Sequence, residues 1–320
     1  YLYGHNEYVI INDTDNKVVP ISDVMAVFRH PLAKITLTSG KQVNFIMSRK
    51  ISIPVNKANI IKYGILDAKF ADQIPDSMVI EIPKGRDYIS KPELFMLDLL
   101  SNYQWDRPIN MLNQGADLNI GIKNYLMYEG YSYKFVPIKI NSSVDDPGLC
   151  DPEELYKMMK TAYSWDAIKR TDYDVDYQNL YTHVGVMPVR GVFVNFANAF
   201  MKSGHNDWAL EALDKCQSVM LDQNYPFETI PLGFTTNDYY IVDIIEDYYK
   251  LGKPEKARAI AVKFSDELFD GARFFLGLNA FGADDFKASI SYSYMLGQIM
   301  EKYGDKKLAA SVLDKLQKMY

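Results

Sequence analysis

Apolar and polar positions alternate in short runs over residues 1–140, and turn residues separate the runs. This pattern is typical of a mixed α/β domain with short strands. The clearest example lies at residues 33–47, where two alternating runs flank Ser39 and Gly40. Because a Ser-Gly pair suits a tight turn, we expect a β-hairpin there.

Three further elements follow in the same region. Residues 50–55 predict a strand, and Pro54 favours an edge position for it because proline donates no hydrogen bond to a neighbouring strand. Residues 78–83 predict another strand. Ser90 and Glu93 have the spacing of a capping box, which predicts the start of a leucine-rich helix.

Residues 107–138 predict a strand–helix–strand unit. The strands are expected over 107–112 and 131–138, and the helix between them over 118–128, ended by Gly130. A unit of this kind is typical of two parallel strands.

The pattern changes near residue 140, so we expect three parts: a mixed α/β domain over 1–140, a connecting helix and tyrosine-rich loop over 141–187, and an all-α domain over 188–320. The charge changes at the same place. The chain carries 16 basic and 14 acidic residues before this boundary, net +2, and 19 basic and 27 acidic residues after it, net −8. Asp151 and Pro152 predict the start of the connecting helix.

Three segments of the all-α part share the spacing Gly-x4-Ala. Their glycines, Gly204, Gly252 and Gly304, are 48 and then 52 residues apart. Glycine suits the left-handed end of a first helix, and an alanine five positions later allows a second helix to approach closely. We therefore expect tetratricopeptide-like helical hairpins with inserted residues, since the usual period is about 34. A generic antiparallel helix pair is the alternative.

Composition excludes several classes of protein. The formal charge of −6 and the pI of about 5.3 argue against a nucleic-acid surface. No apolar run approaches the roughly 18 residues of a membrane span. Two cysteines and four histidines argue against a disulfide scaffold and leave little material for a metal centre, so we expect neither a metal nor another cofactor.

One candidate ligand site lies in the loop of residues 113–117, whose polar members are Asn113, Gln114 and Asp117. The loop follows an expected parallel strand and precedes an expected helix, and ligands of open α/β sheets bind at such strand ends. A connector without a ligand is the alternative, because no acid–base pair or nucleophile accompanies the loop.

A second candidate site is the tyrosine cluster Tyr173, Tyr177 and Tyr181. Its rings could stack against sugars, and packing in a core is the alternative. The acidic residues among these tyrosines resemble the start of a calcium loop. Tyr177 stands where such a loop needs glycine, however, and His183 where it needs glutamate, which argues against calcium.

Six stretches together resemble one family in their order and spacing: residues 50–56, 90–100, 102–109, 125–137, 155–159 and 212–216. The family is a set of multi-spanning membrane proteins common in Bacteroidetes and of unknown function. Their amino-terminal half is similar to protein O-mannosyltransferases, and their carboxy-terminal region is soluble and ends in tetratricopeptide-like repeats. A vertebrate transmembrane O-mannosyltransferase is similar in layout. The resemblance covers about residues 45–270.

The resemblance implies a soluble accessory domain of a membrane-bound glycosyltransferase-like protein in the cell inner membrane. It also implies that this domain faces the periplasm, that the spans precede Tyr1, and that the partners are an acceptor protein and the chain's own transmembrane region. The catalytic groups would lie in the transmembrane region, so we expect no catalytic residue and no independent activity here. The sequence departs from the family at residues 110–113, where the family has aromatic and small residues.

Two other interpretations stay open. A stand-alone repeat scaffold could bind a partner protein through its helical hairpins. A glycan-binding module could use the tyrosine-rich loop.

Overall fold

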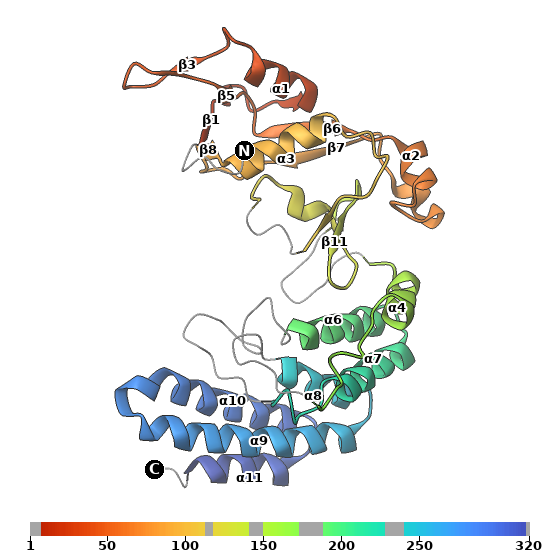
Figure 1. The fold of residues 1–320 in the computed structure, drawn as a ribbon, viewed down its shortest axis with the longest axis vertical. Helices are drawn as coiled ribbons and strands as arrows, with labels where there is room; N and C mark the ends of the chain where they lie inside the picture. Colours follow the sequence, from red (N-terminus) through yellow and green to blue (C-terminus); the bar gives the residue numbers. More distant parts are fainter. Residues whose placement is uncertain (1–7, 113–117, 141–149, 173–187, 228–239, 318–320) are drawn as a thin grey trace. The chain divides into compact units, whose positions relative to one another are not determined.

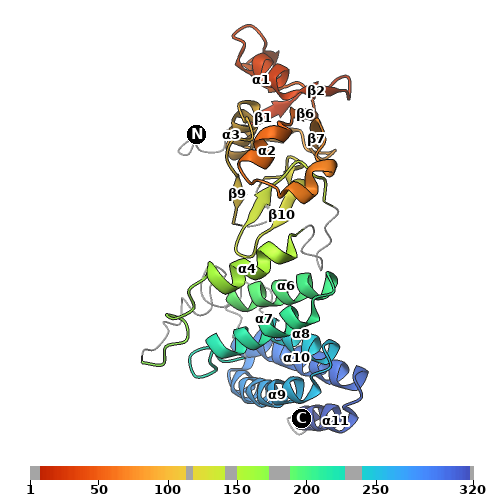
Figure 2. The ribbon, with the colours of Figure 1, turned by 90° about the vertical axis from the view of Figure 1, so that its right-hand side faces the viewer.

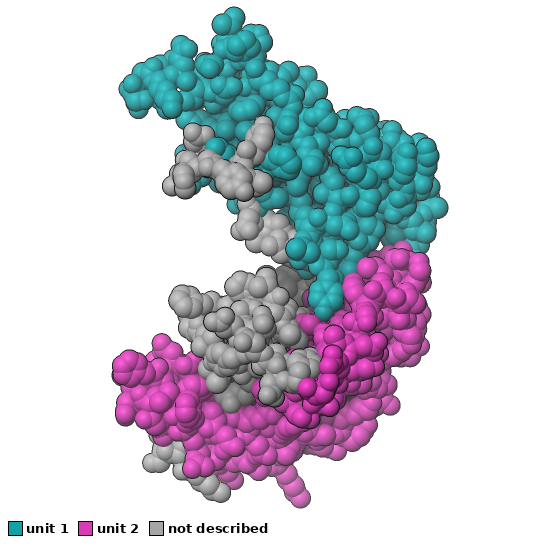
Figure 3. Space-filling view, viewed as in Figure 1, with its two compact units in different colours: residues 1–150 teal, residues 151–320 magenta. Residues whose placement is uncertain are grey.

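The computed structural model describes residues 8–112, 118–140, 150–172, 188–227 and 240–317. The chain divides into two compact units, residues 1–150 and residues 151–320, which Figure 3 colours separately. Each unit has its own apolar core. The mixed α/β character expected for the first part and the helical character expected for the second are both confirmed.

Unit 1 is built from short strands in small sheets, with helices packed against them (Figure 1). Its strands are β1 Val9–Ile11, β2 Val18–Pro20, β3 Ile35–Thr36, β4 Gln42–Val43, β5 Phe45–Ile46, β6 Lys50–Pro54, β7 Ser77–Glu81, β8 Tyr88–Ile89, β9 Asn110–Met111, β10 Leu126–Tyr128 and β11 Tyr133–Phe135. Its helices are α1 Ile21–Arg29, α2 Lys57–Lys62, η1 Ala68–Gln73, α3 Lys91–Ser101 and η2 Ile122–Tyr125, of which η1 and η2 are 3-10 helices.

The expected hairpin at residues 33–47 is confirmed in part. β3 pairs with β4 in antiparallel register, and Gly40 takes a φ of +80° in the turn between them. The second run does not continue as one strand, because β5 leaves the hairpin and pairs in parallel with β1.

The edge position expected for residues 50–55 is wrong, since β6 lies between β2 and β7. Its pairing with β2 is parallel and ends at Ser52, so β2 does not reach Pro54. On the other side, Pro54 lies opposite Ser77 of β7. The proline therefore occupies a position where one neighbouring strand has already ended, and its carbonyl accepts a hydrogen bond from Trp105 Nε1 at 2.9 Å.

The helix expected over 118–128 and the parallel strands around it are also wrong. This stretch holds only the short helix η2 and then β10, which forms an antiparallel sheet in the order β10-β11-β9. Gly121 explains the difference, because its φ of +86° interrupts any helix through this point. A Cβ there would lie 2.6 Å from the backbone nitrogen and oxygen of Glu81, so only glycine fits. Gly130, at φ +81°, serves the turn between β10 and β11.

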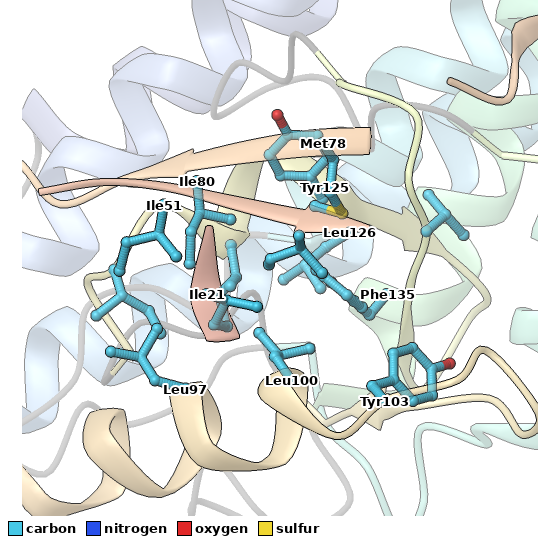
Figure 4. Close-up of a cluster of buried hydrophobic side chains, with 14 of the residues drawn as sticks. Ile21, Ile51, Met78, Ile80, Leu97, Leu100, Tyr103, Tyr125, Leu126 and Phe135 are labelled. Atoms are coloured by element: carbon cyan, nitrogen blue, oxygen red, sulfur yellow. The ribbon is translucent and has the colours of Figure 1, made fainter. Parts of the chain in front are cut away.

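The core of unit 1 gathers apolar side chains from the three three-stranded sheets and from helices α1 and α3, and Figure 4 shows part of it. Ile51 and Ile80 come from paired positions of β6 and β7, and Leu97 comes from α3; none of the three is exposed. Burial of a side chain of this size contributes about 1.5–3 kcal/mol, so the core is the main source of stability in the unit.

Unit 2 is helical. Its elements are α4 Pro152–Thr161, α6 Pro188–Lys202, α7 Asn206–Val219, α8 Tyr240–Lys250, α9 Pro254–Gly277, η3 Asn279–Gly282, α10 Ala283–Lys302 and α11 Lys306–Gln317. Helices α6 and α7, α8 and α9, and α10 and α11 form three hairpins that lie side by side (Figures 1 and 2). Helix α4 packs against α6 at the start of the series.

The same turn closes each hairpin. Gly204, Gly252 and Gly304 have φ values of +84°, +69° and +89°. The residue after each glycine donates its backbone N–H to the carbonyl four residues before the glycine, at 2.8 Å in all three turns. This is the Schellman arrangement, which satisfies the last carbonyls of the first helix.

The remaining positions of the repeated pattern are buried. The residues four before the glycines are Phe200, Tyr248 and Met300, and the alanines five after them are Ala209, Ala257 and Ala309. All six are at most 5% exposed. The spacing found in the sequence therefore marks three real helical hairpins.

Candidate functional site

Both groups of predicted site residues lie outside the described residues. This holds for Asn113, Gln114 and Asp117 and for Tyr173, Tyr177 and Tyr181. The premise for the first group is nevertheless wrong, because β9 pairs with β11 in antiparallel register and no parallel strand leads into the loop.

The residues just after this loop are firmly held. The backbone N–H of Asn119 donates to Oε1 of Glu93 at 2.8 Å, and Nη1 of Arg86 donates to the Asn119 carbonyl at 2.9 Å. Arg86 also forms an ion pair with Glu93, and the backbone N–H of Ser90 donates to Glu93 Oε2 at 2.7 Å. The predicted capping box is thus confirmed, and its glutamate has a second role as an anchor.

Burial alone would raise the pKa of the Glu93 carboxyl, since the residue is only 1% exposed. The hydrogen bonds from Arg86 and Ser90 outweigh burial and hold this pKa below its usual value. Glu93 is therefore an ionised structural group and does not exchange protons near neutral pH.

The candidate site of unit 2 is a hollow of about 340 Å³ between the end of α4, the loop after it and one face of α7. Its lining residues are Met159, Lys160, Tyr163, Ser164, Trp165, Asp166, Glu211 and Lys215. Met159 and Trp165 are almost completely buried and supply an apolar floor. Charged side chains form the rim. This volume lies at the lower end of the range of small-molecule and side-chain pockets.

The α7 wall of the hollow follows from helical spacing. Trp208, Glu211 and Lys215 are three and four residues apart, so they lie on one face of α7. Tyr156 of α4 stacks on Trp208 with ring centroids 4.3 Å apart and planes 11° from parallel. His205 stacks on Trp208 as well, at 3.9 Å. Stacked rings therefore join α4 to α7 beside the hollow.

Glu211 is fully engaged. Its Oε2 accepts a hydrogen bond from the Tyr156 hydroxyl at 2.6 Å, and its Oε1 pairs with Lys160. Hydrogen bonds from Lys160 and then Tyr156 lower the pKa of the Glu211 carboxyl, and its acceptance of these bonds raises the pKa values of Tyr156 and Lys160. All three pKa values are shifted away from neutral pH. These three side chains are therefore suited to holding one another or a ligand, and not to acting as a general acid or base.

Lys215 differs from Lys160. Among the described residues, no carboxylate lies within ion-pair distance of its ammonium group. Its charge still lowers the pKa values of Glu211 and Asp166 through space, after the larger effects of Lys160 and Lys169. Among the described residues that line the hollow, Lys215 is therefore the cation without a direct ion pair to a carboxylate.

Hydrogen bonds from Asn224 and Tyr225 hold the loop that follows α4 and lines the hollow. The Tyr225 hydroxyl donates to the Ile168 carbonyl at 3.0 Å, and Asn224 Nδ2 donates to the Arg170 carbonyl at 2.7 Å. Tyr225 is itself held by Arg190 of α6, which donates to its carbonyl. The end of this loop, at Ile168 and Arg170, is therefore held against the segment that follows α7.

Tyrosine, carboxylate and cation also combine between the hairpins. Asp214 accepts from the Tyr248 hydroxyl at 2.9 Å and from Lys256 at 2.5 Å. Asp305 accepts from the Tyr249 hydroxyl at 2.5 Å and from Arg258 Nε at 2.8 Å. These clusters connect α7 to α8 and α9, and the start of α11 to α8 and α9, so their role is structural.

The sequence did not single out the hollow. Its one available signal was the three- and four-residue spacing of Trp208, Glu211 and Lys215. That pattern on an exposed helix is too common to mark a site without knowledge of what packs beside it.

Within the described ranges, no group of three histidine, cysteine, aspartate or glutamate side chains could hold a metal ion. Among the helices described, none combines the length and the apolarity needed to cross a membrane.

The fold therefore defines a two-unit protein: a small-sheet α/β unit and a helical-hairpin unit with a polar-rimmed hollow. The family model called TMEM260-associated domain 2 matches residues 1–154, which are unit 1 and the first residues of α4. No curated protein and no solved structure matches the chain. The match is consistent with the membrane-protein family that the sequence resembles, over residues 1–154. The helical hairpins lie outside the matched residues.

Proposed function

We propose that this chain is an accessory region of a membrane-bound glycosyltransferase-like protein, where it binds or positions an acceptor protein and does not catalyse alone. The match of residues 1–154 to a TMEM260-associated domain carries the proposal, because it connects the α/β unit with a named transmembrane protein family. The resemblance to O-mannosyltransferase-like membrane proteins supplies the glycosyltransferase part.

The helical unit supports the acceptor-handling role. Three hairpins with the same Schellman turn and the same buried alanine form a continuous series, as tetratricopeptide-like repeats do. Stacked hairpins offer an extended surface that suits a peptide segment. In this proposal the accessory region faces the periplasm, where acceptor proteins of the parent would be found.

Membrane topology of the full-length parent tests the proposal. A reporter active only outside the cytoplasm, fused after the position of Tyr320, should be active, and a cytoplasmic reporter at the same place should be silent. Deletion of residues 151–320 from the parent should abolish transfer of sugar to protein while leaving the parent in the membrane. A cytoplasmic position of Tyr320, or full transfer by the deleted parent, would contradict the proposal.

A stand-alone repeat scaffold is the second candidate, and the regular hairpin series is the observation that favours it. The two candidates differ in one respect. A scaffold requires no transmembrane partner, so a parent without spans would favour it over the accessory role.

A further inference from the structure

We propose that the hollow between α4 and α7 binds a short peptide segment of an acceptor protein. In this segment one acidic residue stands next to an apolar residue. This inference rests on the proposed function, because it names the segment of an acceptor protein that the helical unit would hold. It concerns residues other than those of the two loops that the sequence suggested.

The shape of the hollow supports an apolar side chain in its depth. The floor is formed by Met159 and Trp165, which are 2% and 6% exposed, and Tyr163 lies at its side. Trp165 is wedged against Phe193 of α6, with ring centroids 4.7 Å apart. An apolar group that enters the hollow would therefore leave water and contact side chains that are already packed. Because these side chains need not be ordered on binding, the entropic cost of binding is low.

The charged side chains at the rim of the hollow favour a ligand that carries a carboxylate. Glu211 pairs with Lys160 and accepts a hydrogen bond from the Tyr156 hydroxyl, and Asp166 pairs with Lys169 at 2.7 Å. Lys215 has no such carboxylate partner among the described residues, although it lines the same hollow. The charge that a ligand can complement is therefore positive, and a carboxylate fits it.

The ligand is expected to carry one carboxylate and not a run of them. Residues 151–320 hold 19 basic and 25 acidic residues, which gives this unit a net charge of −6. A strongly acidic peptide would be repelled by the unit as a whole. A single carboxylate next to Lys215 is attracted by the ammonium group, and one negative charge is repelled only weakly by the rest of the unit. Among macromolecules, a protein segment with one acidic residue beside an aromatic or aliphatic one meets both requirements, whereas a neutral glycan would leave Lys215 without a partner.

A pair of matched peptides tests the proposal on the complete 320-residue chain. The probes are the acetylated and amidated tetrapeptides Gly-Phe-Glu-Gly and Gly-Phe-Gln-Gly, which differ only in the charge of one side chain. Binding is followed by the indole N–H resonance of Trp165, identified by its absence in Trp165→Phe. The acidic peptide should bind about two- to fivefold more tightly, as expected for a partly exposed ion pair.

Variants of Lys215 test whether this residue causes the preference for the acidic peptide. Lys215→Ala should remove it, and Lys215→Glu should reverse it in favour of the amide peptide, while the fold measured by circular dichroism stays unchanged. Lys157→Ala is the control, because Lys157 lies on α4 outside the lining of the hollow, is 68% exposed and pairs with Glu154. It should leave the preference intact.

Three results would overturn the proposal. They are the absence of a Trp165 shift with the acidic peptide, equal affinity for the two peptides, and a preference that survives in Lys215→Glu. Titration with methyl mannoside distinguishes the glycan alternative, since a Trp165 shift with the sugar alone would make the hollow a glycan site. None of these outcomes depends on the topology of the parent, so this inference and the proposed function can fail separately.

Discussion

Glu93 shows how one buried carboxylate can organise several segments of unit 1. Its oxygens accept hydrogen bonds from Arg86, from the start of α3 at Ser90 and from the backbone of Asn119. A buried charge is costly unless it is paired and hydrogen-bonded, and here every partner is in place. The residue therefore fixes the position at which the chain returns after the loop of residues 113–117.

Glu93→Gln should lower the free energy of unfolding of unit 1 by about 2–4 kcal/mol, because the amide keeps the shape but leaves the Arg86 guanidinium without its counter-charge. Urea denaturation followed by the fluorescence of Trp105 measures the loss. Glu81→Gln is the control, since Glu81 is exposed on β7, and it should change stability by less than about 0.5 kcal/mol.

The pH dependence of this difference follows from the lowered pKa of Glu93. A carboxyl whose pKa is lower in the folded state stabilises the fold above its unfolded value, about 4.5, and loses that contribution as the pH falls through the folded value. The gap between the wild type and Glu93→Gln should therefore be complete at pH 6 and should narrow steadily below about pH 4. A gap that is constant from pH 6 to pH 3 would contradict the ion-pair explanation.

At the scale of elements, the three hairpins depend on a close approach that only a small side chain permits. Ala309 lies in the α10–α11 hairpin and is 5% exposed, whereas its neighbour Ala310 is exposed. Four residues after Ala309 on α11, Leu313 packs toward Gly297 of α10. A Cβ built on Gly297 would lie 3.5 Å from the Leu313 side chain, an ordinary contact distance, so one methyl group would fit between them.

Ala309→Leu should destabilise unit 2 by about 1–3 kcal/mol, because three extra carbon atoms must be forced into a packed helix interface. Ala310→Leu adds the same atoms on the exposed face and should change stability by less than about 0.5 kcal/mol. The comparison is made by thermal unfolding at 222 nm. Equal effects of the two substitutions would show that the alanine of the Gly-x4-Ala pattern does not determine the packing.

The same elements show why some could be predicted from sequence and others could not. The hairpins were predictable because Gly204, Gly252 and Gly304 mark local turns whose requirements are visible in the chain itself. The false helix over 118–128 had a local cause as well: its apolar residues are buried on more than one face, so their spacing does not separate a helix from a strand. The close approach of Gly121 to Glu81, which settles the matter, is a tertiary contact that no local pattern contains.

At the scale of the whole molecule, the candidate site was less predictable than the fold. The hollow draws its residues from α4, the following loop and α7, and about 45 residues separate Asp166 from Glu211. Each contributing segment looks like an ordinary amphipathic helix or loop. The packing of α4 against α6 and the stack of Tyr156 on Trp208 bring them together.

The two units should fold independently, because each has its own buried core and domains of this size can fold alone. Leu97→Ala removes a fully buried side chain from unit 1 and should lower its stability by about 2–5 kcal/mol without changing unit 2. Trp105 reports on unit 1, and Trp165 and Trp208 report on unit 2, so single-tryptophan versions of the chain follow each transition separately. The fragments 1–150 and 151–320, expressed alone, should reproduce the two transitions. A shift of both transitions in Leu97→Ala, or fragments that do not fold, would show that the units stabilise one another and that the helical unit is not an independent binding module.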